Sequence, residues 1–416
     1  MPKATFKDRI LSKIVKSEAK VGHRANLASV SSSAWLLRLY YLASYASIGV
    51  FLPFISPWLV AQDISGIRLS AVTCSRPIAG IIAPLIFGWL ADRFRMRGSL
   101  LRFACATSFI PFAILTFMQG LGVGVGFTGV FFAVAAFSFF RIPMMTIADV
   151  AAMETPKSFG GLRLWGSLGF ICAALPVGFL IKDWHSVAFP FAISLSLLLA
   201  VFVAWRLPTR AAPTARDTQA GLREVLGRRE LWLMFGIWAL WAVSHVAYDL
   251  CFSLRLRDLG AKPVDVSVAW CLGTIAEVAL MAVSGALLSR ASHATWTLIG
   301  LVGTALRWLL MAKAQSLSLL LLLQPLHAIS FALLWVTWLD FVKQNAPRHL
   351  LGRAQGALST VVSVGSAVGI LFWGPLYASR GAAFVFDSAA VIAAGAAVLS
   401  LVPLRTTLLI RSATNV

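Results

Sequence analysis

The chain has 416 residues, of which 59% are hydrophobic and 12% are charged, with a mean hydropathy of +0.83. An average soluble protein carries about 25% charged residues, so this composition excludes a soluble enzyme, a disordered chain and a fibrous repeat. A helical protein that crosses a membrane several times remains. The five cysteines lie in apolar segments, without a spacing typical of disulfides or zinc ligands. We therefore expect no metal site and no cofactor.

Apolar stretches recur along the whole chain. A bilayer core about 30 Å thick requires roughly 20 apolar residues per helix, and on this basis the sequence predicts twelve transmembrane helices. The first six are expected at 34–60, 67–91, 99–118, 121–153, 161–181 and 185–205. The second six are expected at 231–254, 264–288, 294–312, 316–342, 353–378 and 382–404.

One long polar segment divides these helices into two groups of six. Residues 206–230 contain two prolines and six arginines. We therefore expect an all-α membrane protein with one six-helix bundle over 34–205, a cytoplasmic linker over 206–230 and a second six-helix bundle over 231–404. Residues 405–416 would be a cytoplasmic tail, and residues 1–33 a basic amphipathic helix on the inner leaflet. An organelle transit peptide is the alternative for residues 1–33, although their acidic residues argue against it.

The net charge of +20 is unevenly distributed. If both termini, the linker and the loops on the same side face the cytoplasm, that side holds 23 lysines and arginines, whereas the opposite loops hold seven. This asymmetry fits the positive-inside rule with both termini in the cytoplasm. Membrane topology therefore explains the charge, and we expect no nucleic-acid partner.

A short basic loop follows the second predicted helix and contains the run Gly88-Trp-Leu-Ala-Asp92-Arg93. Gly88 would permit close helix packing, and Asp92 would accept hydrogen bonds at the end of a neighbouring helix. The spacing recurs at Gly285-Ala-Leu-Leu-Ser-Arg290, after the eighth predicted helix. An ordinary basic loop is the alternative. The pattern resembles the loop of the major facilitator superfamily, whose members have two related six-helix halves with a substrate site between them.

Ionisable side chains inside the predicted helices are the main functional signal, because they are costly in hydrocarbon and usually face a cavity or a partner. In the seventh predicted helix, His245, Tyr248, Asp249 and Phe252 recur at i, i+3, i+4 and i+7 and so share one helical stripe. The other ionisable candidates are Asp149, Arg163, Glu277, Arg307 and His327.

These residues also have structural alternatives. Arg38 and Arg76 can equally snorkel or pair with backbone carbonyl groups, and His245 alone is more typical of a hydrogen-bonded packing residue. Glu277 is the only acidic residue in an otherwise apolar predicted helix. A carboxyl group there is stable when it is protonated or when Arg307 or His327 balances it, and either state suits a proton carrier.

Five short motifs follow one another through the predicted helices. They are Arg163-Leu-Trp-Gly-Ser167, His245-x-x-Tyr248, Ala276-Glu277-Val278, Leu306-Arg307-Trp308 and Leu326-His327-Ala328. In this order they resemble the 3-phenylpropionate transporter family, which is related to lactose permease, an oligosaccharide:proton symporter. The resemblance covers nearly all of residues 34–404 and implies the major facilitator fold.

The resemblance also implies functional roles. Asp149 and Arg163 would form a charge pair at the substrate site, and Glu277 would contact substrate and communicate with a proton site that includes Arg307 and His327. The candidates for substrate binding are therefore Asp149, Arg163, Trp165, His245, Tyr248, Phe252 and Glu277. The candidates for proton coupling are Glu277, Arg307 and His327, and those for a conformational loop are Gly88, Asp92 and Arg93.

Three positions depart from these relatives, and one of them is Phe159, which replaces the tyrosine usual before Gly-x-x-Arg. Three residues after His327, Ser330 stands where lactose permease has the glutamate that carries the transported proton. Asp249 stands where phenylpropionate transporters usually have an aromatic residue. If transport is proton-coupled, the proton must therefore use Glu277, Asp149 or an acid outside the pattern.

We expect a secondary active transporter rather than an enzyme, because the sequence has no catalytic motif and no phosphate-binding loop. The favoured activity is proton-coupled uptake of a small organic solute, in particular an aromatic carboxylate such as phenylpropionate, by a monomer in a bacterial inner membrane. Arg163 or Arg307 would then be the counter-charge of the carboxylate. The alternatives are a sugar or nucleoside proton symporter, a proton-driven efflux pump and a non-transporting receptor of the same fold.

Overall fold

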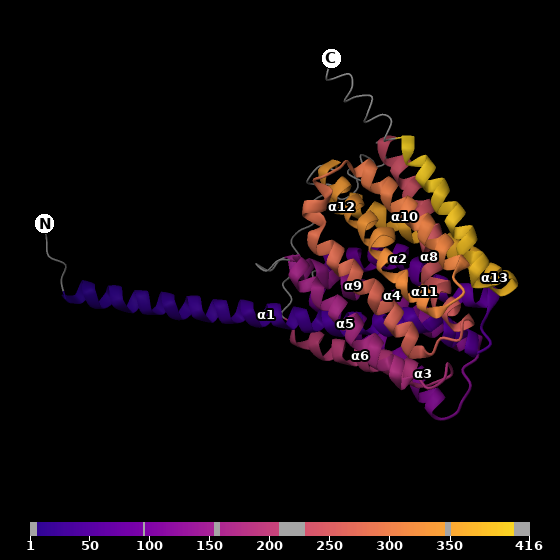
Figure 1. The fold of residues 1–416 in the computed structure, drawn as a ribbon. Coiled ribbons are helices and arrows are strands. Elements are labelled where there is room, and N and C mark those ends of the chain that lie inside the picture. Colours follow the sequence, from indigo (N-terminus) through magenta and orange to yellow (C-terminus); the bar gives the residue numbers. More distant parts are fainter. Residues whose placement is uncertain (1–5, 95, 154–158, 208–228, 346–350, 403–416) are drawn as a thin grey trace, which may run out of the picture.

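The computed structural model describes residues 6–94, 96–153, 159–207, 229–345 and 351–402, and for residues 6–33 only the backbone. This part of the chain contains helices and loops but no strand (Figure 1). The first half comprises α1 (Phe6–Ala61), α2 (Gly66–Phe94), α3 (Arg97–Gly120), α4 (Phe127–Met153), α5 (Phe159–Leu180) and α6 (Ala188–Arg206). The second comprises α8 (Arg229–Asp258), α9 (Pro263–Leu288), α10 (His293–Lys313), α11 (Leu317–Leu322), η1 (Gln324–Leu326), η2 (Ala328–Leu333), α12 (Leu334–Asn345) and α13 (Leu351–Leu399).

Some predictions fall on residues outside this set. Residues 208–228 of the expected linker and the whole expected tail at 405–416 lie outside the described residues, as does the side chain of Asp92. The helix α1 begins at Phe6 and runs without a break into the first expected span (Figure 1). The expected apolar face of residues 1–33 concerns side chains that are not described, so it stays a prediction.

Eleven helical segments of the described chain are long and apolar enough to cross a membrane. They follow the predicted spans, and the largest shift of a starting residue is at the fourth. That span was expected to begin at residue 121, but α4 begins at Phe127. Residues 121–126 contain three glycines, and Gly122 has a φ of +71°. Glycine is a poor helix former and readily adopts such angles, so this segment forms a loop.

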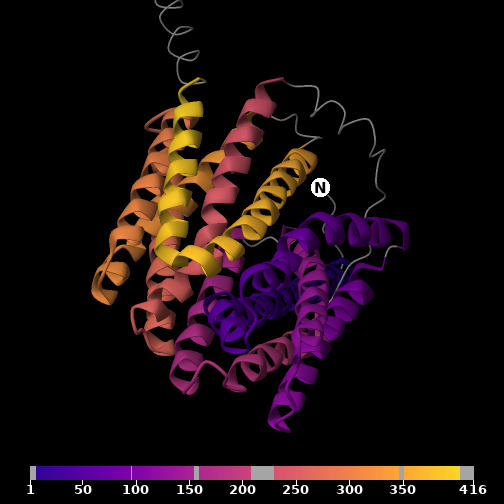
Figure 2. The ribbon, with the colours of Figure 1, turned by 90° about the vertical axis from the view of Figure 1, so that its right-hand side faces the viewer.

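The last two predicted spans are joined in α13, whose apolar segment covers 46 residues. A membrane of about 30 Å needs roughly half that length. Gly381 interrupts the helix with φ 76° and ψ 172°, a conformation open to a residue without a Cβ. Figure 2 shows α13 changing direction sharply along its course. The count of twelve membrane crossings and the cytoplasmic position of both termini stay predictions.

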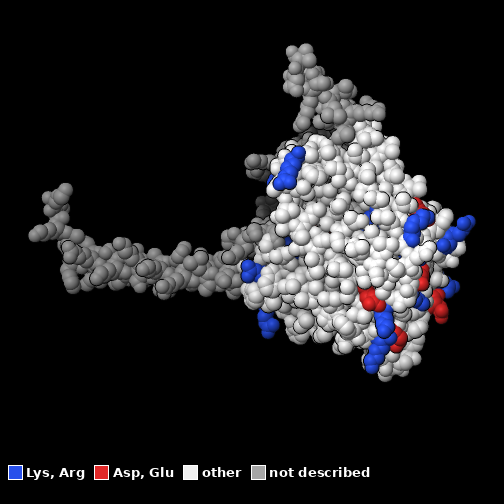
Figure 3. All heavy atoms as spheres, viewed as in Figure 1, with Lys and Arg blue, Asp and Glu red and all other residues white. Residues whose placement is uncertain are grey.

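The helices pack in two groups, α1–α6 and α8–α13 (Figure 2). In the first, α1 packs against α5 and α6, and α3 packs against α4 and α6; in the second, α13 packs against α8 and α10. The halves meet where α2 contacts α13, α5 contacts α9 and α1 contacts α8. Figure 3 shows a broad surface with almost no charged side chain between the ends of the helices, which suits contact with lipid.

The two halves are closed against each other at one end, where α1 and α8 end and α2 and α9 begin. There Oγ of Ser70 donates to the carbonyl oxygen of Ile370 at 2.7 Å, and Oγ of Ser267 donates to that of Ala174 at 2.8 Å. Gly374 lies directly against Ser70, and a Cβ on it would also come within 2.8 Å of the backbone of Gly66. Glycine is therefore required for this approach. We call this region the closed end.

The tenth predicted span, expected as one helix over 316–342, is interrupted. The α-helix α11 is followed by a 3-10 turn, η1, and a π-helical turn, η2, before α12 resumes. Pro325 in η1 lacks a backbone donor and so removes one hydrogen bond of a regular helix at this position. A π turn inside an α-helix is rare and occurs frequently at functional sites. His327 and Ser330, two residues singled out in the sequence, lie at this interruption.

Candidate functional site

A cavity of about 340 Å³ lies between the two halves. Its size is typical of a site for a small organic molecule. The first half lines it with residues of α1, α2 and α5, and the second half with residues of α8, α9, η2, α12 and α13. Five of the predicted site residues line it, and so does Asp249, which belongs to the same helical stripe as His245. The five are Arg163, His245, Tyr248, Glu277 and His327.

The wall formed by the second half is largely aromatic. The rings of Tyr248 and Trp270 lie 4.9 Å apart, and His327 stacks against Tyr248 at 5.2 Å and against Phe331 at 5.2 Å. Trp335 continues this layer beyond Phe331. Aromatic rings packed in this way offer a planar, apolar surface with a fixed shape. The wall is therefore suited to an aromatic or other planar group of a substrate.

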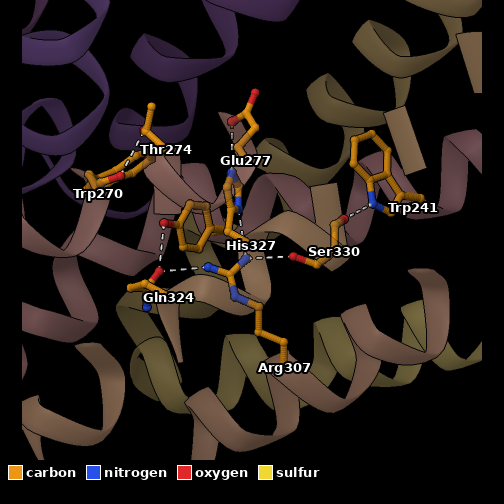
Figure 4. Close-up of polar contacts among 9 residues, drawn as sticks. Trp241, Trp270, Thr274, Glu277, Arg307, Gln324, His327 and Ser330 are labelled. Atoms are coloured by element: carbon orange, nitrogen blue, oxygen red, sulfur yellow. Dashed lines mark hydrogen bonds and ion pairs between the residues drawn. The ribbon is translucent and has the colours of Figure 1, made fainter. Parts of the chain in front are cut away.

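Behind this wall, Arg307 organises a polar network within the second half (Figure 4). Its side chain is 0% exposed. Nη1 donates to Oγ of Ser330 at 2.8 Å, and Nη2 donates to Oε1 of Gln324 at 2.9 Å. The guanidinium also lies over the ring of Tyr248, 4.5 Å from its centre. Arg307 is thus bound by neutral groups and does not line the cavity.

His327 connects this network to the cavity. Nη1 of Arg307 lies 3.0 Å from Nδ1 of His327. A guanidinium has only donors, so Nδ1 must accept and the ring proton must lie on Nε2. Nε2 is 3.8 Å from Oε2 of Glu277. His327 is therefore a neutral ring that presents an N–H toward the carboxyl group of Glu277. Figure 4 shows this ring nitrogen directed at the carboxyl group.

In the first half, Arg163 on α5 faces Asp149 on α4. Nη1 of Arg163 lies 3.4 Å from Oδ2 of Asp149, and the hydroxyl of Tyr41 donates to Oδ1 of Asp149 at 2.6 Å. Arg163 lines the cavity, whereas Asp149 is not among the lining residues. The structure thus places the two residues side by side, and their role in substrate binding stays a prediction.

The site has a second ion pair, which, unlike the first, joins the two halves. Nη2 of Arg76 on α2 donates to Oδ2 of Asp249 on α8 at 2.7 Å, and both side chains line the cavity. They are partly exposed, at 35% and 23%. We expected Arg76 to snorkel, to pair with backbone carbonyl groups or to face a cavity; it faces the cavity and pairs with a carboxylate.

Several predicted site residues lie away from the cavity lining. Trp165 lines a separate apolar groove of about 390 Å³ between α5 and α9. Phe252 is fully buried and stacks behind Tyr248 at 4.6 Å. The expected conformational loop is at the far end of α2: Arg93 is exposed there, and a Cβ on Gly88 would meet no atom within 4 Å. The close packing expected at Gly88 is therefore wrong for this conformation, and the loop's role stays a prediction.

Sequence reasoning missed part of the cavity. Trp270, Phe331 and Trp335 were not singled out, although they line it. Tryptophans and phenylalanines are frequent throughout this chain, so residue type alone gives no signal. For Trp270, the spacing of i and i+7 to Glu277 on the same helix was an available signal, because it places both on one face.

A family model described as the MFS_1 like family matches residues 34–388. The chain belongs to this family. The match includes both halves and every residue of the cavity lining.

Relatives and solved structures agree with this assignment. The chain is 25% identical over 361 residues to a probable 3-phenylpropionic acid transporter of Escherichia coli (strain K12), covering 84% of this chain and 92% of the relative. It is 26% identical over 350 residues to the maltose permease of Geobacillus stearothermophilus, covering 80% and 82%. A crystal structure of a mutant of the nucleoside transporter NupG has a TM-score of 0.77 at 18% identity, covering 89% of this chain and 99% of that chain.

The protein is therefore a membrane transporter that crosses the bilayer several times, and not an enzyme. In this fold, a substrate site between two helical halves is reached from one side of the membrane at a time. The cavity between the halves is the part of this structure that corresponds to such a site.

Proposed function

We propose that the protein takes up a small organic anion together with protons, an aromatic carboxylate such as phenylpropionate being the favoured substrate. The observation that carries this proposal is the composition of the cavity. Arg76 and Arg163 provide positive charge from the first half, and aromatic rings provide a planar apolar wall from the second. A guanidinium binds a carboxylate with two parallel hydrogen bonds, and the wall accepts the aromatic ring.

The predicted residues then have defined positions around such a substrate. His245 and Tyr248 contribute to the aromatic wall, and Arg163, supported by Asp149, is a positive group on the opposite side. Arg307 is buried behind the wall, so we assign it to the support of Tyr248 and His327 rather than to the substrate carboxylate. Trp165 and Phe252 support the site from outside the lining.

Proton coupling requires a carboxyl group or histidine that both water and substrate can reach. Two carboxyl groups line the cavity, Glu277 and Asp249. Ser330 occupies the position of the proton-carrying glutamate of lactose permease, and here its hydroxyl accepts a hydrogen bond from Arg307. A proton taken up during transport would therefore bind Glu277, as the sequence predicts, or Asp249.

A sugar or nucleoside is the second candidate substrate. Glu277 and Thr274 lie one turn apart on α9 and both line the cavity. Together with Ser167 they present oxygen atoms that accept or donate hydrogen bonds to hydroxyl groups. A maltose permease is among the relatives, which supports this alternative.

Proton-driven efflux and a non-transporting receptor are the remaining alternatives for the function. We expect the protein to be a monomer in the inner membrane.

The experiment is a transport assay in proteoliposomes. Internal pH is recorded while phenylpropionate, cinnamate, lactose and a nucleoside are added in turn. Protein-free liposomes correct for passive entry of the protonated acids. We expect phenylpropionate or cinnamate to move protons through the protein and the neutral solutes to have no effect. Proton movement with lactose or the nucleoside alone would contradict the proposal and favour the second candidate.

A further inference from the structure

Arg76 and Asp249 lie where the contact between the two halves meets the cavity. Following α2 away from the closed end, Sγ of Cys74 first contacts the carbonyl oxygen of Ala367 at 3.6 Å. The ion pair comes next, and a close approach of Gly80 to Ser363 follows. Because α2 and α8 belong to different halves, this ion pair must break or rearrange when the halves separate at the closed end.

Arg76 differs from the other arginines of the site in its partner. Arg307 is fully buried and donates to neutral groups of its own half. Arg163 forms its ion pair with Asp149 of its own half, although Glu277 of the other half also acts on it electrostatically. A substrate that takes over Arg76 therefore replaces a contact between the halves. A substrate that takes over Arg163 replaces an ion pair within one half.

We propose that a monoanionic carboxylate binds Arg76 in place of Asp249, and that Asp249 then takes up the transported proton. This inference rests on the proposed proton-coupled uptake. The hydrogen bond between Arg76 and Asp249 breaks, one forms between Arg76 and the substrate carboxylate, and a hydronium ion transfers its proton to Oδ2 of Asp249 and leaves as water. No other bond changes. An unpaired carboxylate in a cavity of low dielectric is strongly unfavourable, so anion and proton enter together.

Two properties of transport follow from this exchange. One negative and one positive charge enter the site in each cycle, so uptake is electrically neutral with one proton per anion. A neutral sugar brings no charge to replace Asp249 at Arg76, so the ion pair stays closed. The exchange also removes the need for an acid at position 330. The proton site lies instead beside Arg76, the cation that binds the substrate.

Other charged or titratable groups face the same cavity. They are Tyr45 from α1, Arg163 from α5, Glu277 from α9, His327 from the turn between η1 and η2, and His245 and Tyr248 from α8 itself. The helix α13 contributes Val362 and Ser366 to the lining, neither of which is charged. Asp249 forms its ion pair with Arg76, whereas Glu277 faces His327. Glu277 is therefore the competing proton acceptor, and its variant is compared with that of Asp249.

The test measures how pH changes the binding of phenylpropionate to the purified full-length protein. Above about pH 6 the ligand is a monoanion. Wild-type affinity should fall about tenfold per pH unit at alkaline pH, because one proton binds with each anion. In Asp249→Asn the affinity should be independent of pH, since the amide is always neutral. Glu277→Gln should keep the wild-type slope.

Further variants guard against a folding defect. Asp249→Glu restores a carboxyl group and should restore the slope. If Asp249→Asn cannot be purified, the double variant Arg76→Gln/Asp249→Asn leaves no unpaired charge and should fold without binding the anion. In proteoliposomes, Asp249→Asn should exchange labelled phenylpropionate but should not accumulate it in response to a pH gradient.

The outcomes separate this inference from the proposed function. An Asp249→Asn protein that keeps the slope, or a slope lost only in Glu277→Gln, would overturn the role of Asp249. A double variant that still binds the anion would overturn the role of Arg76. Each of these leaves proton-coupled uptake standing. A wild-type protein that binds phenylpropionate without any pH dependence would contradict both proton coupling and this inference.

Discussion

The polar network around Arg307 and the ion pair of Arg76 and Asp249 place an arginine at membrane depth in two different ways. Arg307 is 0% exposed and bound by neutral groups of one half, whereas Arg76 is 35% exposed and bound by a carboxylate of the other half. Contacts within a half can persist while the halves move against each other. A contact between the halves cannot. The first arrangement is therefore suited to structural support, and the second to a switch that substrate operates.

Among the substitutions that test this comparison, the largest effect is expected at Arg307, on the free energy of unfolding. Arg307→Met leaves Oγ of Ser330 and Nδ1 of His327 without their donor, whereas Gln324 keeps the hydrogen bond from Tyr248, and each unsatisfied buried group costs about 1–3 kcal/mol. We expect the free energy of unfolding to fall by about 3–5 kcal/mol. The measurement is the thermal unfolding temperature of the purified protein, which should be lower than that of the wild type. Lys313→Met on the same helix is the control, because this side chain is 68% exposed. An Arg307→Met protein as stable as the control would contradict the supporting role.

The next largest effect is expected for substrate binding, at Arg76. Arg76→Gln removes the cation proposed to bind the carboxylate, and such a loss costs about 3 kcal/mol, or roughly 100-fold in affinity. Its unfolding temperature should change less than that of Arg307→Met. Arg68→Gln, on the same helix but outside the cavity lining, is the control and should bind phenylpropionate like the wild type. Equal affinities for the Arg76 and Arg68 variants, measured by equilibrium binding, would remove Arg76 from the site.

A smaller effect is expected when the closed end is opened sterically. A Cβ in Gly374→Ala would collide with Ser70 and the backbone of Gly66. Overpacking of this kind costs about 1–3 kcal/mol, so the closed arrangement becomes less populated. Buried Cys74 should then react with a thiol reagent roughly 5-fold to 100-fold faster in a Cys172→Ser background. Gly395→Ala, where a Cβ meets no atom within 4 Å, is the control, and equal labelling rates would count against the closed end as a gate.

The smallest effect separates the aromatic wall from the groove outside it. Trp335→Leu removes a ring from the cavity lining, which should weaken phenylpropionate binding by about 1 kcal/mol. Trp165→Leu changes the groove between α5 and α9 and should leave binding within about twofold. Titration calorimetry on both variants tests the difference. A stronger effect of Trp165→Leu would indicate that the substrate binds in the groove and not in the cavity.

The sequence predicted the helices better than their contacts. Long apolar stretches set the position of the membrane-spanning segments, and Gly381 separates two predicted spans that follow each other in α13. The start of α4 was missed, because residues 121–126 are apolar enough for a span while their glycines favour a loop. Periodicity also placed Phe252 on the stripe of His245, but this stripe passes from the cavity into the packed interior.

The two ion pairs also show that a local sequence pattern predicts contacts between neighbouring helices but not contacts between the halves. Asp149 and Arg163 lie 14 residues apart on consecutive helices, so their contact is within reach of a sequence interpretation. Arg76 and Asp249 lie 173 residues apart in different halves. Nothing in the local pattern of either helix shows which faces of the two halves meet. Only the packing of the halves brings this cation and this acid together.

The charge carried by each transport cycle tests the exchange at Arg76 and Asp249 most directly. Proteoliposomes containing the wild-type protein are given labelled phenylpropionate under an imposed membrane potential, and entry of substrate and protons is recorded together. We predict one proton per phenylpropionate and an initial rate that does not change with the potential. Phenylpropionate uptake without protons, or a rate that follows the potential, would contradict the exchange.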